Sequence, residues 1–131
     1  MTARTLVGFR TGDGHYAVPV EQTREVRAAE GIVPLPAPRP GVVGLLQRGD
    51  DALPILDALG AGDKHVLVVD VGEQPFGLLV EEVSGVVTVQ DGDVGPPPPG
   101  QEDAVIVGVV SLGESLLLLV DAAALAAVLD S

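Results

Sequence analysis

The residues of this chain that could do chemistry are few and widely spaced. The two histidines, His15 and His65, each lie beside a turn at the expected start of a strand, where a partly exposed structural histidine is commoner than a base or a metal ligand. Asp50, Asp51 and Asp57 offer oxygen ligands, but their spacing fits no calcium-binding loop. The chain has no cysteine, which removes disulfides, thiolate metal sites and thiol catalysis. We therefore expect no metal site and no cofactor, and an enzyme with a carboxylate site stays open only as a distant alternative.

Two further motifs resemble functional sites but lack the sequence context that those sites need. Val66-Leu-Val-Val-Asp70 is similar to a magnesium-binding strand of nucleotide-binding proteins, but no G-x-x-x-x-G-K-[ST] sequence accompanies it to hold phosphates. Lys64, the single lysine, sits in a turn before an apolar run, somewhat like the modified lysine of lipoyl carrier domains. A carrier domain modified at Lys64 stays open as a distant alternative, although it would leave much of the chain unexplained.

Charge is distributed unevenly along the 131 residues. The chain has 7 Lys+Arg against 19 Asp+Glu, a net charge of −12, and residues 65–131 contain no Lys or Arg at all. Nucleic acid is therefore a poor partner, because neutralising phosphates needs clustered cations. The N-terminal stretch has no apolar core of a secretory signal, and the longest apolar stretch, Leu116 to Leu129, is too short to cross a bilayer. We expect a cytoplasmic protein with no direct membrane insertion.

Short apolar, β-branched runs separated by Gly, Pro and Asp dominate the chain, and they predict about ten strands. The expected strands are Leu6 to Phe9, Tyr16 to Val20, Ile32 to Leu35, Val42 to Leu46, Leu53 to Leu56, Val66 to Val71, Phe76 to Val80, Val86 to Val89, Val105 to Ser111 and Leu116 to Val120. Many strands with short turns favour small barrels or a sandwich.

Two short helices are expected to interrupt the strands. Glu21 to Glu30 contains no Gly or Pro, and Asp121 is a good N-cap for a helix over Ala122 to Leu129, with Leu125, Val128 and Leu129 inward. Pro96 to Pro99 predicts a stiff connector between two halves of the molecule.

Laid end to end, these segments resemble the CheW family, the coupling proteins of bacterial chemotaxis arrays. The similar segments are Gly14-His-Tyr-Ala-Val-Pro-Val20 of the opening hairpin, Thr23-Arg-Glu-Val-Arg27, Val33-Pro-Leu-Pro36, Leu53-Pro-Ile-Leu-Asp57, Gly77-Leu-Leu-Val-Glu-Glu-Val-Ser84, Pro97-Pro98, and Gly108-Val-Val-Ser-Leu112 with Leu117-Leu-Leu-Val-Asp121. Each motif alone is weak, but their order over nearly the whole chain is specific.

The resemblance implies an all-β fold of two small five-stranded β-barrel subdomains packed side by side, with the whole of residues 1–131 forming one domain of two intertwined subdomains. It also implies a non-enzymatic scaffold that couples the helical hairpin at the cytoplasmic tip of a chemoreceptor to the regulatory domain of a CheA-type histidine kinase. A diverged module serving another kinase or a non-chemotactic pathway stays open as an alternative.

By the same resemblance, the partner-binding residues are Thr23, Glu25, Val26, Arg48, Gly49, Val83 and Val86. The family's N-L-R-G motif is altered here to Leu46-Gln-Arg-Gly49, which places Arg48 one position early. A one-residue slip in a strand turns a side chain to the opposite face. We therefore expect a bulge between Arg48 and Leu53 that returns the arginine to the groove between the barrels. The alternative is a strand without a bulge, in which Arg48 is turned away and paired to a nearby acid on the surface.

Overall fold

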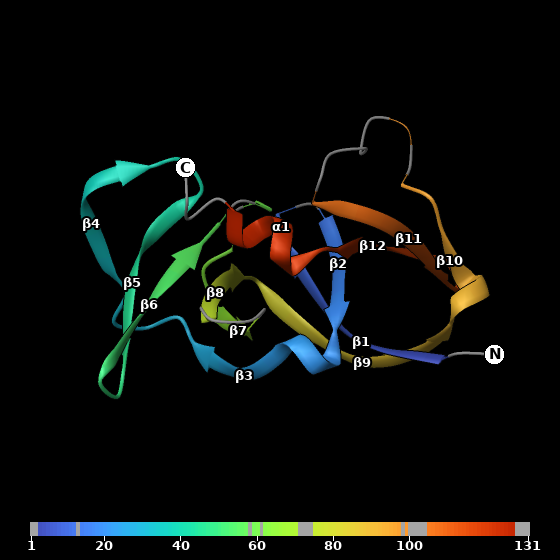
Figure 1. Ribbon diagram of the computed structural model, residues 1–131, viewed down its shortest axis with the longest axis horizontal. Coiled ribbons are helices and arrows are strands. Elements are labelled where there is room, and N and C mark those ends of the chain that lie inside the picture. Colours follow the sequence, from blue (N-terminus) through green and yellow to red (C-terminus); the bar gives the residue numbers. More distant parts are fainter. Residues whose placement is uncertain are drawn as a thin grey trace.

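The computed structural model of the chain describes residues 3–12, 14–57, 59–60, 62–70, 75–97, 99 and 105–127. These residues form two six-stranded β-sheets, one short α-helix and two 3-10 turns (Figure 1). The elements are β1 (Ala3–Thr11), β2 (Gly14–Pro19), η1 (Val20–Gln22), β3 (Thr23–Ala28), β4 (Val33–Arg39), β5 (Val42–Arg48), β6 (Asp51–Leu56), β7 (His65–Asp70), β8 (Pro75–Val80), β9 (Glu82–Gln90), η2 (Asp91–Asp93), β10 (Val94–Gly95), β11 (Ile106–Leu112), β12 (Ser115–Val120) and α1 (Ala122–Ala126).

The two sheets lie side by side, and the chain passes from one to the other and back (Figure 1). The first sheet has the order β10-β11-β12-β2-β1-β9, and the second has the order β3-β7-β8-β6-β5-β4. Neighbouring strands are antiparallel except β12 with β2 and β6 with β8. Because strands from both ends of the chain build the first sheet, that sheet depends on pairing between residues far apart in sequence.

One hydrophobic cluster joins the two sheets. Phe9 from the first sheet and Phe76 from the second are both fully buried in it, together with Leu125 of α1. Consecutive residues of β1 face different clusters, since Val7 and Phe9 lie in this shared cluster whereas Leu6 packs into a separate core of the first sheet. This period of two is what a strand buried on both faces requires. The second sheet also has a core of its own, which includes Leu53.

The prediction of a helix from Glu21 to Glu30 is wrong. The segment forms η1 and then β3, which pairs antiparallel with β7 and places Val26 opposite Leu67. A helix of about ten residues is marginal in water by itself. Without β3, the buried strand β7 would leave a row of backbone groups unpaired, so pairing outweighs the helix propensity of this segment.

The predicted β fold with two subdomains packed side by side is confirmed, but each sheet has six strands and not five. The additional strands are β3 and the two-residue β10. The proline run also has a different place from the one expected. Pro96, Pro97 and Pro99 follow β10 on the way to β11, its neighbour in the same sheet, while Pro98 lies outside the described residues.

The second predicted helix is present as α1. Asp121 caps it as expected, because its Oδ1 accepts a hydrogen bond of 3.1 Å from the backbone N–H of Ala123. Leu125 is fully buried in the cluster between the sheets. The remaining predicted inward residues, Val128 and Leu129, lie outside the described part of the chain.

Removing this cap should weaken the packing of α1 on the hydrophobic cluster between the sheets. We expect Asp121→Ala to lower the free energy of unfolding by about 0.5–2 kcal/mol, the usual cost of losing an N-cap. Urea denaturation followed by circular dichroism measures it. Glu114→Ala, in an exposed turn, is the matched control and should change stability by less than about 0.5 kcal/mol. Equal effects of the two substitutions would contradict a capping role.

Candidate functional site

A groove with a volume of about 230 Å³ lies between β3 of the second sheet and β9 of the first, and we call it the inter-sheet groove. Each of these strands is the terminal strand of its sheet. The groove is lined by Val7, Val20, Thr23, Arg24, Glu25, Val26, Leu67, Val83, Gly85 and Val86. It is therefore a surface that only the packing of the two sheets creates.

The floor of the groove is buried and its rim is not. Val7 and Leu67 form the floor, are 7% and 1% exposed, and belong to the core cluster shared by the sheets. Their cross-strand neighbours, Val86 and Val26, are 64% and 49% exposed. Exposed apolar side chains next to a buried apolar floor are typical of a surface that contacts another molecule.

A bulge in β9 explains why two valines three positions apart share this surface. In a regular strand, Val83 and Val86 would point to opposite faces. Pairing with β1 skips one residue, so that Ser84 is extra between Val83 and Gly85. The Ser84 Oγ lies 3.1 Å from His15 Nε2 on the other face of the strand. The extra residue places both valines in the groove.

The β3 wall is also irregular and is fixed by polar contacts. Arg24 is the extra residue of a bulge between Thr23 and Glu25. Its Nε and Nη2 donate to Oδ2 of Asp70 at 3.2 and 2.8 Å. The Thr23 hydroxyl donates to the carbonyl of Val20 at 2.8 Å, which fixes the step from η1 into β3. Of the two charged residues of this wall, Arg24 is therefore held by Asp70 and Glu25 by Arg48, before any partner binds.

The expected bulge between Arg48 and Leu53 is absent, and that prediction is wrong. The ladder from β5 to β6 is regular here, with Leu46 opposite Leu53 and Arg48 opposite Asp51. Gly49, with φ of 58°, begins a two-residue turn that closes the hairpin without an extra residue. The Arg48 Nη1 instead lies 3.5 Å from Glu25 Oε1 on the groove wall.

The structure brings together most of the residues predicted to bind a partner. Five of the seven line the groove, namely Thr23, Glu25, Val26, Val83 and Val86. Arg48 does not line it and reaches it through Glu25, whereas Gly49 lies in the exposed turn between β5 and β6. Their role in binding stays a prediction.

Sequence reasoning missed the floor of the groove. Val7 and Leu67 have the sequence pattern of ordinary core residues, and Gly85 has no side chain that would indicate a binding role. Interpreting Thr23 to Ala28 as a strand would have revealed Leu67, because it is the cross-strand neighbour of Val26.

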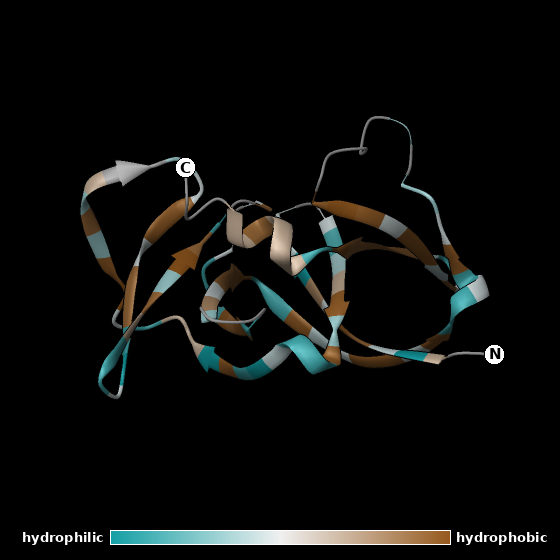
Figure 2. Cartoon of the chain, viewed as in Figure 1, coloured by the Kyte–Doolittle hydropathy of each residue, from teal (hydrophilic) through white to brown (hydrophobic). Residues whose placement is uncertain are grey.

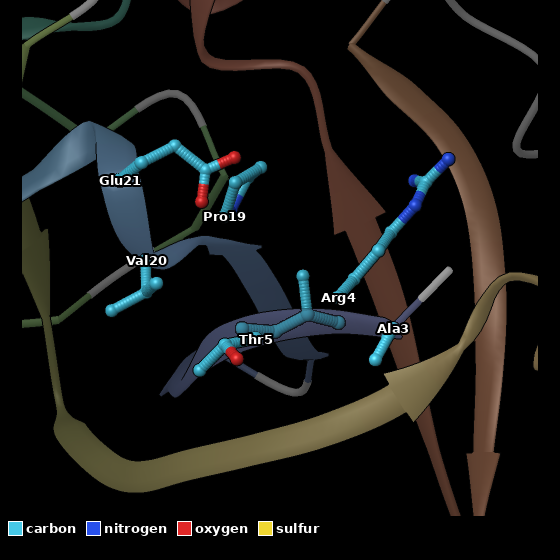
Figure 3. A pocket seen from close by; sticks show the side chains of 7 residues that line it. Ala3, Arg4, Thr5, Pro19, Val20 and Glu21 are labelled. Carbon is cyan, nitrogen blue, oxygen red and sulfur yellow. The ribbon is translucent and has the colours of Figure 1, made fainter. Parts of the chain in front are cut away.

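A second hollow of about 420 Å³ lies where β1 begins, beside η1 (Figure 3). Its charged residues are Arg4 and Glu21, whose side chains extend in different directions in Figure 3. The Arg4 Nε is 2.8 Å from Asp91 Oδ1, so its charge is already paired. This hollow shares Val20 with the groove but contains none of the predicted site residues.

The two histidines and the single lysine lie apart from the groove. His15 and His65 are at the beginnings of β2 and β7, as expected, and Lys64 Nζ is 3.7 Å from Glu81 Oε1. Within the described ranges, no three His, Cys, Asp or Glu side chains are close enough to hold a metal ion. The described helical residues also include no segment with the length and apolarity needed to cross a membrane.

The Arg48–Glu25 pair should contribute little to stability. Both side chains are substantially exposed, at 30% and 43%, and exposed pairs contribute about 0–1 kcal/mol. A double-mutant cycle with Arg48→Ala and Glu25→Ala should therefore give a coupling energy below about 1 kcal/mol, smaller still at high salt. The same cycle on Arg24 and Asp70 is the comparison. A coupling energy for Arg48 and Glu25 well above 1 kcal/mol would show a structural pair.

Comparison with known proteins identifies the family. The model of the CheW-like domain matches residues 5–129. The chain is 34% identical over 104 residues to the chemotaxis protein CheW of Rhizobium meliloti (strain 1021), covering 72% of this chain and 67% of that protein. It is 29% identical over an alignment of 134 residues to the probable chemotaxis protein CheW of Rhizobium etli, covering 93% and 86%.

A solved structure has the same fold. The scaffolding protein TtCheW from Thermoanaerobacter tengcongensis superposes with a TM-score of 0.80 and 19% identity, covering 92% of this chain and 90% of that one. The expectation of an all-β fold of this type is thus confirmed. The family match over nearly all of the chain, the relatives and the two-sheet architecture agree, and the chain belongs to the CheW-like domain family of non-enzymatic chemotaxis scaffold proteins.

Proposed function

We propose that this scaffold couples chemoreceptors to a CheA-type histidine kinase in the cytoplasm. The inter-sheet groove would bind the helical hairpin at the cytoplasmic tip of a receptor, and strand edges elsewhere would contact the regulatory domain of the kinase. These partners are those implied by the family resemblance.

The groove is the observation that carries the proposal. An amphipathic helix binds a protein groove through apolar side chains on one of its faces, with polar residues at the margins. The inter-sheet groove offers the complementary arrangement, with Val26 and Val86 exposed on opposite rims above a buried apolar floor. Arg24 and Glu25 stand on the β3 side, each held by an ion pair.

The experiment that tests the proposal is reconstitution. A receptor cytoplasmic fragment and a CheA-type kinase are combined with and without this protein, and kinase autophosphorylation and co-sedimentation are measured. We expect this protein to enter a ternary complex and to make kinase activity depend on the receptor. Binding to neither partner would overturn the proposal.

A diverged module is the second candidate function, and one observation favours it. Arg48 lies in a regular ladder outside the groove lining, and Gly49 is in a turn beside it. If the reconstitution shows binding to the kinase domain without binding to the receptor, the chain serves another input to a kinase.

The lipoyl-carrier alternative receives no support from the fold. Lys64 precedes β7, and β6 and β7 are not neighbours in their sheet, so this lysine is not at the tip of a hairpin. An intact mass without an added group at Lys64 would remove this alternative.

A further inference from the structure

The two sheets end in four terminal strands, and three of these carry features that discourage the addition of another strand. β4 contains Pro34, Pro36 and Pro38, which cannot donate backbone hydrogen bonds. β10 has only two residues and is followed by proline. β3 carries three charges in six residues and is largely teal in Figure 2. Prolines, short length and charge are the devices by which natural sheets protect their edges.

The fourth terminal strand, β9, is nine residues long, and its one protective feature after Glu82 is the bulge at Ser84, beyond which the ladder with β1 is regular from Gly85 to Gln90. From Val83 to Gln90 it has no charged residue and no proline, and four of these eight residues are valine. β1 is its single strand partner within the described residues. Its middle is open to solvent, with Val86 64% exposed and Thr88 also exposed. A long, uncharged, β-branched edge is a template for strand pairing.

Hollows of similar size lie on the two faces of β9. One is the inter-sheet groove of about 230 Å³, and the other is a hollow of about 220 Å³ that includes His15, Ser84 and Leu117, which we call the second-face pocket. Consecutive residues of β1 line different hollows, Val7 the groove and Gly8 the pocket, which places the hollows on opposite faces of the sheet. Gly85 lines both, and nothing lies within 4 Å of the position that a Cβ would occupy there.

We propose that the free edge of β9 accepts an extended segment of a partner protein as an added strand. Successive side chains of a strand point to opposite faces, so one side chain of the segment would enter the inter-sheet groove and the next would enter the second-face pocket. The apolar linings call for aliphatic side chains at these two positions. The paired part of the segment is uncharged, like β9 itself.

Charge indicates a basic partner and argues against a second copy of this chain. Acidic residues bound the edge, with Glu82 at one end and Asp91 and Asp93 beyond the other. Pairing two copies through this edge would bring together two chains that each carry a net charge of −12, and this repulsion disfavours the dimer. Glu82 and Asp91 keep Arg10 and Arg4 as partners, so attraction comes mainly from the net charge of −12.

Strand addition at β9 depends on the chemistry of this edge and does not require receptor coupling. The edge shares Val83 and Val86 with the groove, so an added strand and a helix seated in the groove would compete. Loss of strand addition with receptor binding intact would remove this inference and leave the proposed function in place.

The test uses the full chain and a synthetic peptide in which pairs of consecutive valines alternate with single threonines, so that each hollow can receive a valine, with two lysines at each end. Backbone NMR and amide hydrogen exchange are recorded at millimolar peptide. We expect shifts confined to β9 and the two hollows, and amide exchange along β9 slower by about tenfold or more. A peptide with alternate backbone nitrogens methylated cannot form the ladder and should produce no shifts. Equal binding of both peptides would overturn the proposal.

A pair of variants at one position supplies the matched control. Thr88 is exposed and lines neither hollow, so substitutions there should leave the fold intact. We expect Thr88→Lys to weaken peptide binding by about tenfold, since an edge lysine blocks strand addition, and Thr88→Val to retain it. Shifts at β3, β4 or β10 in place of β9, or dimerisation of the chain through β9 without peptide, would overturn the proposal.

Discussion

Replacing Phe76 with alanine is expected to lower the free energy of unfolding by about 3–5 kcal/mol, the usual cost of truncating a buried phenylalanine. Phe76 is fully buried in the cluster that joins the sheets, where it shares a core with Phe9 and Val18 of the first sheet. A cavity at this point removes contacts from both sheets at once. We therefore expect a single unfolding transition, shifted to lower urea concentration, for strands of both sheets.

The control is Leu53→Ala, which truncates an equally buried residue in a core belonging to the second sheet alone. Amide hydrogen exchange distinguishes the two variants. Phe76→Ala should accelerate exchange in β1 and β2 as well as in β7 and β8, whereas Leu53→Ala should act first on the second sheet. Two separate transitions in Phe76→Ala, with the first sheet retaining its stability, would show that the sheets fold independently.

Most of the strands could be predicted from sequence because the signal for each is local. Runs such as Val66 to Val69 and Leu116 to Val120 are apolar, β-branched or bounded by turn residues, and the structure contains strands at these places. β3 could not be predicted in the same way, since its Glu, Arg and Ala residues favour helix locally. It becomes a strand because it pairs with the edge of β7, and that edge exists only once the second sheet is assembled.

The candidate site was predictable only in part, for a similar reason. Resemblance to the family pointed to Val83 and Val86, but their spacing of three places them on one face only because Ser84 forms a bulge. The position of Arg48 was predicted wrongly, because Gly49 closes the β5–β6 turn without the extra residue that a bulge requires. Bulges depend on pairing with a distant strand, and no pattern within one strand specifies them.

Introducing a carboxylate on the rim of the inter-sheet groove is expected to weaken partner binding strongly without unfolding the protein. Val86→Glu and Val26→Glu should each weaken binding of a receptor cytoplasmic fragment by about 30-fold or more, the effect of losing roughly 2 kcal/mol at a central contact. A docked partner would trap the new charge against apolar atoms, where desolvation is costly. Because the two valines are 64% and 49% exposed, the free energy of unfolding should change by less than about 0.5 kcal/mol.

A matched control lies on the far edge of the second sheet. Val33 of β4 is 62% exposed, almost as much as Val86, but it does not line the groove, so Val33→Glu adds the same charge in a similar setting elsewhere. Calorimetry or surface plasmon resonance should show unchanged binding for this variant, since the total charge of the chain changes equally in all three. If Val33→Glu weakens binding as much as Val86→Glu does, repulsion from the acidic chain and not the groove is responsible. If neither rim variant weakens binding, the receptor contacts another surface, and the exposed valines of β3 and β9 need a different partner.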